Sequence, residues 1–158
     1  MQFVYELRPF QQVEAAMVAH WASEPDDLWN LTGQRDIPLT RDQVEAWPLE
    51  SNFALTLRYL GDLVAFAEIV EDEVEGDAEI VHLVVAPDMR RAGHGTAMLE
   101  RLCLFLQEAR PWPHVWIRVG RDDQVTKRCA ESAGFIEQPD VSGPRFVWLK
   151  RNLTRTAP

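Results

Sequence analysis

The chain has 158 residues, which is enough for one domain with its own hydrophobic core. Apolar residues make up 46% and charged residues 26%, proportions typical of globular proteins, and no apolar run is long enough to cross a bilayer. The formal net charge of −9 would repel nucleic-acid phosphates. Together these features argue against a nucleic-acid partner and against a membrane partner.

The start of the chain, the cysteines and the histidines predict the compartment of the protein and whether it binds a metal. The start of the chain has no signal-peptide pattern, which predicts a cytoplasmic protein. Cys103 and Cys129 fall within predicted helices, and we expect both to be reduced packing residues. The four histidines are scattered through the chain and form no ligand cluster, so no metal site is expected.

The first third of the chain reads as one strand followed by helices. Residues 3–8 alternate as a strand does, and residues 11–22 have helical spacing, with a predicted buried face of Val13, Met17, Val18 and Trp21. Pro25 suits the first position of a second helix. The capping-box pair Thr40 and Gln43 predicts a short helix over residues 41–47. Large side chains gather here, and core packing is the simplest interpretation of them.

The middle of the chain reads as a meander of strands. Residues 53–60 and 63–70 are rich in apolar β-formers and flank a Gly61-Asp62 turn, which predicts a hairpin. Residues 71–77 are mostly acidic and predict a solvated loop. Residues 78–85 form an apolar strand interrupted by His82, and it should pair with the second arm of the hairpin.

The C-terminal half alternates helices and strands. A helix is predicted to begin near Thr96, with Met98, Leu102, Phe105 and Ala109 on its apolar stripe. A strand at 114–119, a helix at 124–132 and a closing hairpin of 135–137 with 145–150 follow. The order βααβββαβαββ predicts a single mixed α/β (α+β) domain over residues 1–151, with a polar tail at 152–158.

Between the fourth strand and its helix lies the run Arg90-Arg91-Ala92-Gly93-His94-Gly95. Glycines 93 and 95 allow positive φ and a close approach of the backbone to a ligand. The amides of residues 91–96 would then lie at the positive end of the helix, a site suited to a pyrophosphate. The alternative is a strand–turn–helix whose glycines serve packing only.

Two segments resemble the GNAT superfamily of N-acetyltransferases. The pattern Arg90-x-x-Gly93-x-Gly95-x-Ala97, preceded by Val85-Ala86-Pro87, is similar to the acetyl-CoA motif of that family, and Ala133-Gly134-Phe135 is similar to its last conserved helix end. The resemblance implies a GNAT-like fold with a mixed central sheet of about seven strands. It also implies acetyl-CoA as co-substrate, bound where the fourth and fifth strands splay apart. The cofactor-binding residues that it implies are Leu83, Val84, Val85, Arg90, Arg91, Ala92, Gly93, His94, Gly95, Thr96, Ala97, Asp123 and Lys127.

By the same resemblance, the reaction is acetyl transfer to a primary amine of a small molecule or a protein N-terminus, by direct attack in a ternary complex. A base must take the proton of the amine, and three residues are candidates. Glu79 lies fourteen positions before Gly93, as in the histone-acetylating branch of the family. His82 is the rival, since imidazole titrates near neutral pH, and Glu68 on the neighbouring strand is the third. With strict alternation Glu79 and His82 face opposite sides, unless a bulge intervenes.

The chain departs from the family pattern at three positions. Ala130 stands where many members have a tyrosine that protonates the leaving thiolate, and Asp123 stands where an asparagine commonly contacts the pantetheine. Arg118 occupies the place of the base used in another branch. These departures keep open an alternative, a catalytically weak acyl-CoA-binding or sensing module. Acidic residues near the groove hint at a cationic acceptor, and a homodimer is expected by analogy only.

Overall fold

The computed structural model describes residues 4–154 and has one seven-stranded sheet in the order β1-β2-β3-β4-β5-β7-β6. Its strands are β1 (Tyr5–Pro9), β2 (Phe53–Tyr59), β3 (Asp62–Asp72), β4 (Asp77–Val85), β5 (His114–Gly120), β6 (Ile136–Glu137) and β7 (Phe146–Asn152). The helices are α1 (Ala15–Trp21), α2 (Pro25–Thr32), α3 (Arg41–Ala46), α4 (His94–Ala109) and α5 (Gln124–Ser132). Short 3-10 turns lie at Gln12–Glu14, Trp47–Leu49, Pro87–Met89 and Pro139–Val141. The predicted mixed α/β class and the mixed sheet of seven strands are confirmed, but three α-helices lie between β1 and β2 where the predicted order βααβββαβαββ has two.

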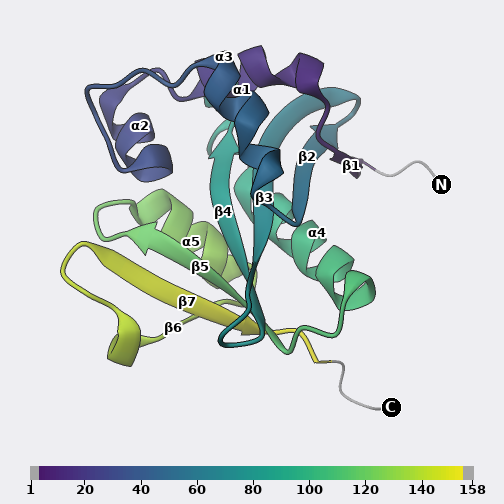
Figure 1. Cartoon of the computed structure of the whole chain (residues 1–158), viewed down its shortest axis with the longest axis vertical. Coiled ribbons are helices and arrows are strands. Elements are labelled where there is room, and N and C mark those ends of the chain that lie inside the picture. The colour runs from purple at the N-terminus through teal and green to yellow at the C-terminus, as the bar shows by residue number, and fades with distance from the viewer. Residues whose placement is uncertain (1–3, 155–158) are drawn as a thin grey trace.

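Helices cover both faces of the sheet (Figure 1). On one face α4 contributes Met98, Leu102 and Leu106 to a core that also contains Ile69 and Ile80 of the central strands. The other face carries a second cluster, in which α1 and α3 pack on β3 and β4 through Ala15, Val18, Val44, Phe66 and Val84. Burial of these apolar side chains from water is the main favourable term in this fold.

The buried face of α1 differs from the predicted one. Val13 is 82% exposed and Met17 is 51% exposed, whereas Ala15, Val18 and Trp21 are buried. The 3-10 turn at Gln12–Glu14 places Val13 outside the α-helix. The predicted stripe was therefore wrong at its first two positions.

The predicted acidic loop is shorter than expected and largely structured. The hairpin strands reach Asp72 and resume at Asp77, so only residues 73–76 form the turn. The carboxylate of Asp77 is buried and accepts hydrogen bonds from His114 Nδ1 at 3.1 Å and Trp116 Nε1 at 2.8 Å. Glu71 accepts one from Trp112 Nε1 at 2.9 Å. Two of these acids thus fasten the hairpin end to β5 and its lead-in.

Two irregularities of β4 shape the middle of the sheet. Phe66 lies opposite Val84 and Glu68 lies opposite Val81, so two residues of β4 bulge out against one residue of β3. His82, in this bulge, has a φ of 54°. On its other edge β4 pairs with β5 in parallel only from Ala78 to Ile80, and beyond that point the two strands diverge, as Figure 1 shows.

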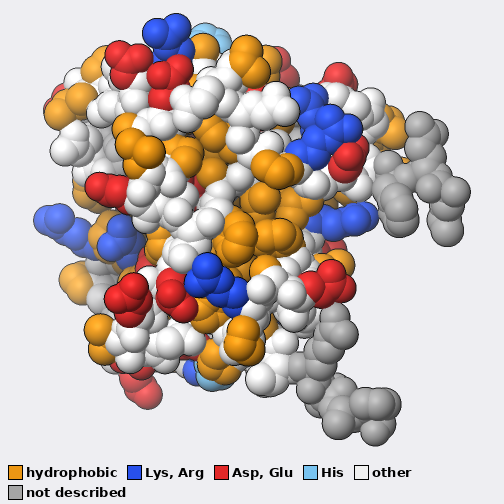
Figure 2. Space-filling model, turned by 45° about the vertical axis from the view of Figure 1, so that its right-hand side comes forward, with side chains coloured by type: hydrophobic (Ala, Val, Ile, Leu, Met, Phe, Trp, Pro, Cys, Tyr) orange, Lys and Arg blue, Asp and Glu red, His pale blue; other side chains and the backbone are white. Residues whose placement is uncertain are grey.

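The surface of the molecule carries charged and apolar side chains together. Figure 2 shows a face on which Lys and Arg side chains are interspersed with Asp and Glu around exposed apolar side chains. Within residues 4–154, no helix is both long and apolar enough to span a bilayer. The first predicted strand began at Phe3, which lies outside the described residues. At the other end β7 continues to Asn152 and Leu153 is buried, and the domain boundary at residue 151 stays a prediction.

Candidate functional site

The loop before α4 carries the strongest sequence motif. Gly93 caps the helix in the left-handed conformation, with φ of 85°, so α4 begins at His94, two residues earlier than predicted. This helix end has no side-chain cap and no acid in its first turn. The first amides of an α-helix have no partner within the helix, and here nothing from a side chain caps them. The end of α4 therefore offers free N–H donors and a positive dipole to an anion.

Gly95 serves a different purpose from the predicted one. It lies within α4 and has no positive φ, but a Cβ built on it would meet Cys129 Sγ of α5 at 3.0 Å. The glycine therefore lets α4 and α5 approach each other closely. The second left-handed residue of the loop is Arg91, with φ of 64°.

The side chain of His94 points into the protein rather than toward a phosphate. It is 3% exposed and its Nδ1 lies 2.8 Å from the hydroxyl of Tyr5, while the ring of Tyr59 packs against it. Burial lowers the pKa of His94, which favours the neutral imidazole. The two tyrosines, distant in sequence from the loop, thus support it from β1 and β2.

Arg90 is engaged within the protein. Its guanidinium donates to the Val85 carbonyl at 3.1 Å, to Asp27 of α2 at 2.8 Å and to the Trp21 carbonyl at 3.4 Å. We predicted Arg90 as a donor to the cofactor, but in this structure it ties the loop to α2. Arg91 is exposed and stays available as a cation at the loop.

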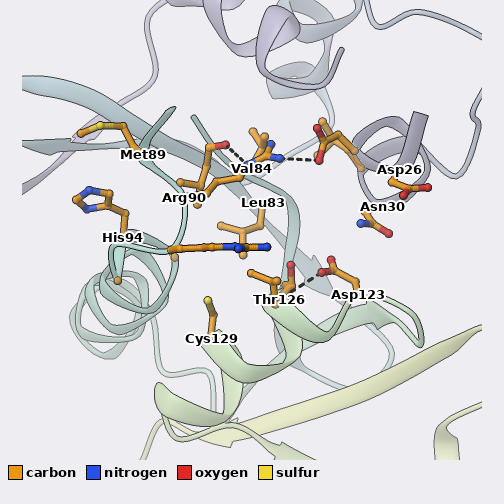
Figure 3. Close-up of a pocket in the computed structure, with 17 residues that line it drawn as sticks. Asp26, Asn30, Leu83, Val84, Met89, Arg90, His94, Asp123, Thr126 and Cys129 are labelled. Atoms are coloured by element: carbon orange, nitrogen blue, oxygen red, sulfur yellow. Dashed lines mark hydrogen bonds and ion pairs between the residues drawn. The ribbon is translucent and has the colours of Figure 1, made fainter. Parts of the chain in front are cut away.

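A cavity of about 480 Å³ lies beside this loop, between β4, α2 and α5 (Figure 3). Of the residues predicted to bind cofactor, it is lined by Leu83, Val84, Val85, Arg90, Arg91, Gly93, His94, Gly95 and Asp123. Ala92, Thr96, Ala97 and Lys127 are not in its wall, and the Lys127 ammonium lies 3.3 Å from Glu137. Sequence reasoning missed the contributions of α2, the loop and α5, namely Asp26, Asp27, Asn30, Leu31, Met89, Val125, Thr126 and Cys129.

Asp123 is the N-cap residue of α5. Its carboxylate accepts a hydrogen bond from the Thr126 amide at 3.1 Å and so caps the N-terminus of α5. Aspartate is among the best N-cap residues, and Asn and Asp serve this purpose equally well. The exchange relative to the family pattern therefore leaves the helix start intact.

A second cavity, of about 280 Å³, continues from the first. The two share Asn30, Leu31 and Leu83 along with two residues of the α5 start, so they meet where β4 and β5 diverge. Glu79 and His82 of β4 both line the second cavity, and Arg118 of β5 lines it too. Strict alternation would place Glu79 and His82 on opposite faces of β4. The bulge breaks this alternation, as the sequence required if both were to line one cavity.

Two of the three base candidates form one unit. Nδ1 of His82 lies 2.7 Å from Oε1 of Glu68, whose side chain is 1% exposed, and the His82 ring stacks on Trp47 at 3.8 Å between centroids and 11° between planes. The contact orients the His82 ring, because it holds Nδ1 at the Glu68 carboxyl and leaves Nε2 on the other edge of the ring. A His82 ring that donates from Nδ1 to Glu68 would leave Nε2 able to accept a proton.

Glu79, the third candidate, is half-buried on β4. Burial raises the pKa of its carboxyl, while the nearby Arg118 guanidinium opposes this rise and Asp72 adds to it. A carboxyl with a raised pKa is suited to proton transfer. Glu79 has no partner comparable to the Glu68 carboxylate that orients His82.

The structure also shows the surroundings of Ala130 and of the two cysteines. Ala130, at the place of the family tyrosine, is fully buried in the core and offers no proton donor. Within residues 4–154, no group of three His, Cys, Asp or Glu side chains could hold a metal ion. Both cysteines are free thiols, as predicted, with Cys103 in the core and Cys129 on the cavity wall.

Known proteins resemble the chain in sequence and in structure. It is 31% identical over 100 residues to mycothiol acetyltransferase of Saccharomonospora viridis, a match that covers 58% of this chain and 30% of that protein. The aminoglycoside acetyltransferase AAC(6')-Ib, in complex with ribostamycin and coenzyme A, superposes with a TM-score of 0.77 at 20% identity over 95% of this chain and 94% of that chain. The structure of yncA from Salmonella typhimurium with acetyl-CoA gives 0.75 at 15% identity over 99% and 98%.

The family itself is identified by a sequence model. The model of the GNAT acetyltransferase family matches residues 15–135, which include the helices on the α1 face, the central strands, the Gly93 loop and α5. The chain therefore belongs to the GNAT family of acetyltransferases.

Proposed function

We propose that the protein is an acetyl-CoA-dependent N-acetyltransferase that acts on a primary amine of a small molecule or a protein N-terminus. Family membership supports acyl transfer, and the structural neighbours named above hold acetyl-CoA or coenzyme A. The two joined cavities supply separate places for a coenzyme and an acceptor, which direct attack in a ternary complex requires.

The residues around the larger cavity fit the coenzyme. When bound, acetyl-CoA supplies an acetyl group activated as a thioester. The free amides at the start of α4 suit its diphosphate, and Arg91 adds positive charge. Leu83 and Val84 lie in the part of β4 that has no β5 partner, so this edge is open to an extended chain. The volume of about 480 Å³ is typical of small-molecule sites.

His82 is the residue that we assign as base, and the contact between His82 and Glu68 is the single observation that carries this proposal. An amine acceptor enters as an ammonium ion and must lose a proton before it can attack. Nε2 of His82 accepts that proton, and the imidazolium then forms an ion pair with the Glu68 carboxylate 2.7 Å from Nδ1. Glu68 acts through His82 and is a positioning residue, as is Trp47, whose indole fixes the ring plane.

Replacement of His82 tests the assignment. His82→Asn should lower kcat/KM with a reactive amine by about 100- to 10,000-fold, the contribution of a general base. Glu68→Gln should give a smaller loss of kcat/KM, because the base remains but its partner is neutral. Thiol release from acetyl-CoA measures turnover, and heat protection by coenzyme A checks that the cofactor site is intact. Undiminished turnover in His82→Asn would exclude His82 as base.

A second candidate function is a catalytically weak acyl-CoA-binding or sensing module. The buried Ala130 favours it, since no tyrosine stands ready to protonate a leaving thiolate there. Coenzyme A would then protect the protein against heat while no amine in a broad panel releases thiol. A single amine that turns over rapidly would exclude this function.

We also propose a compartment for the protein and consider its assembly. Two free cysteines fit the reducing cytoplasm, where we place the protein. A homodimer remains an expectation by family analogy, and size-exclusion chromatography with light scattering measures it.

A further inference from the structure

We propose that the acceptor carries an acidic group next to its amine, as an α-amino acid does, and that Arg118 binds this acidic group. This inference rests on the proposed acetyl transfer and names the class of acceptor. It concerns the smaller cavity, where β5 faces the bulged part of β4.

Arg118 is exposed on β5 and lies over aromatic rings, and among the described residues no carboxylate contacts it directly. Its guanidinium carbon lies 4.4 Å from the ring centroid of Phe146 and 5.9 Å from that of Trp148. Within the described part of the chain no carboxylate lies within ion-pair distance of it, whereas Arg58 and Arg90 each contact an acid directly. A guanidinium that stacks on an aromatic ring keeps its edge N–H groups free for a planar acid. Arg118 is therefore oriented and still able to bind an anion.

The position of Arg118 matches the second charge of a zwitterion. His82 and Glu79 line the cavity from β4, where the ammonium of the acceptor must lose its proton, and Arg118 lines it from β5. Arg118 is near enough to Glu79 to oppose the effect of burial on that carboxyl. An amine with no acid of its own would give Arg118 no anionic partner, so the arrangement favours an acceptor that carries an acidic group beside its amine.

The size of the cavity agrees with a compact acceptor. Its volume of about 280 Å³ lies just below the range of about 300–1,000 Å³ that is common for ligand sites. A single amino acid suits this space better than a polymer or a molecule of several rings. The aromatic side chains of Trp29 and Phe146 in the wall suit an apolar side chain on that amino acid.

Pairs of amines that differ only by a carboxylate test the proposal. L-phenylalanine is compared with phenethylamine, and L-leucine with isoamylamine, by thiol release from acetyl-CoA. We expect the wild-type protein to prefer the amino acid of each pair by about 10- to 100-fold in kcat/KM, the value of a charge-assisted contact. Arg118→Ala should shrink this preference at least tenfold, mainly through KM. Arg145→Ala, which removes an exposed arginine outside both cavities, should keep the preference and is the matched control.

A binding measurement separates this proposal from the proposed function. Heat protection by each amine is measured with coenzyme A present, for the wild type and for Arg118→Ala. Protection by amino acids that depends on Arg118, without turnover of any amine, would support the subsite and contradict the acetyltransferase. Equal preference within each pair, or equal losses for both members in Arg118→Ala, would overturn the proposal, as would amino acids that neither bind nor react.

Discussion

Glu68 and Glu79, on neighbouring strands, meet different environments. Glu68 is almost fully buried and faces the His82 ring, so its charge has a partner that can become positive. Glu79 is half-buried, and burial raises the pKa of its carboxyl despite Arg118 nearby. The first carboxylate is thus suited to orienting a base, and the second is held closer to its neutral form.

The raised pKa of Glu79 predicts a pH dependence of stability. The folded protein holds this proton to a higher pH than the unfolded chain, so stability falls as pH rises from the ordinary value of 4.5 through the raised one. Glu79→Gln cannot titrate, so this variant should lose less stability than the wild type between pH 4.5 and 7. Urea unfolding at several pH values measures the difference. Identical slopes for the two proteins would contradict the prediction.

The two cysteines should differ in reactivity. Cys103 is in the core, where burial raises the pKa of its thiol to about 11, and Cys129 lines the larger cavity. Because the thiolate is the reactive form, an alkylating agent should modify Cys129 in the native protein and leave Cys103 unmodified. Coenzyme A should slow the reaction at Cys129. Peptide mapping by mass spectrometry measures both rates, with the denatured protein as control, and unchanged Cys129 labelling would count against a coenzyme in this cavity.

At the scale of elements, the start of α4 depends on its neighbour α5. Gly93 ends the loop with a left-handed residue, and Gly95 allows the close contact with Cys129. The family pattern at these positions therefore reflects two separate physical requirements, a helix cap and a helix–helix contact. Both keep the free amides of α4 at the edge of the cavity.

A double-mutant cycle tests the contact between α4 and α5. Alanine usually stabilises a helix by about 1 kcal/mol relative to glycine. Gly95→Ala should not show this gain, because its Cβ would meet Cys129 Sγ at 3.0 Å, and it should raise KM for acetyl-CoA. With Cys129→Ala present, the same substitution should become stabilising. Additive changes in the free energy of unfolding would show that the contact carries no strain.

At the scale of the whole molecule, α2 joins the two cavities. Asn30 and Leu31 line both of them, and Asp27 holds the loop of α4 through Arg90. Helix α2 is thus fastened to the loop before α4 across more than sixty positions of sequence. Loss of this ion pair should loosen both cavities at once.

The contact between Asp27 and Arg90 can be tested against direct binding of the coenzyme by Arg90. If Arg90 acts through α2, then Asp27→Ala and Arg90→Ala should each raise KM for acetyl-CoA about two- to fivefold, the value of a partly exposed ion pair, and the double variant should be no worse than either. Arg91→Ala should add to the effect of each. A normal KM in Asp27→Ala together with a raised KM in Arg90→Ala would indicate direct binding.

Much of the fold, and the place of the Gly93 loop in the wall of the larger cavity, could be predicted from the sequence, because local rules govern them. The capping box at Thr40, the alternation in β2 and β5 and the helix at Gln124–Ser132 depend on residues within a few positions of one another. The motif around Gly93 could be read from the sequence for the same reason, because adjacent residues set a helix cap and its free amides.

Tertiary structure alone decided how the site is assembled. His82 and Glu68 seemed to be rival bases, yet a shift in the register between β3 and β4 brings them into one hydrogen-bonded pair under Trp47. In the same way only the tertiary structure shows that Arg90 contacts Asp27 of α2 and that Arg118 packs on Phe146 of β7. Strand register and long-range packing are set by the total burial of the chain rather than by local backbone preference, so no short pattern in the sequence encodes these contacts.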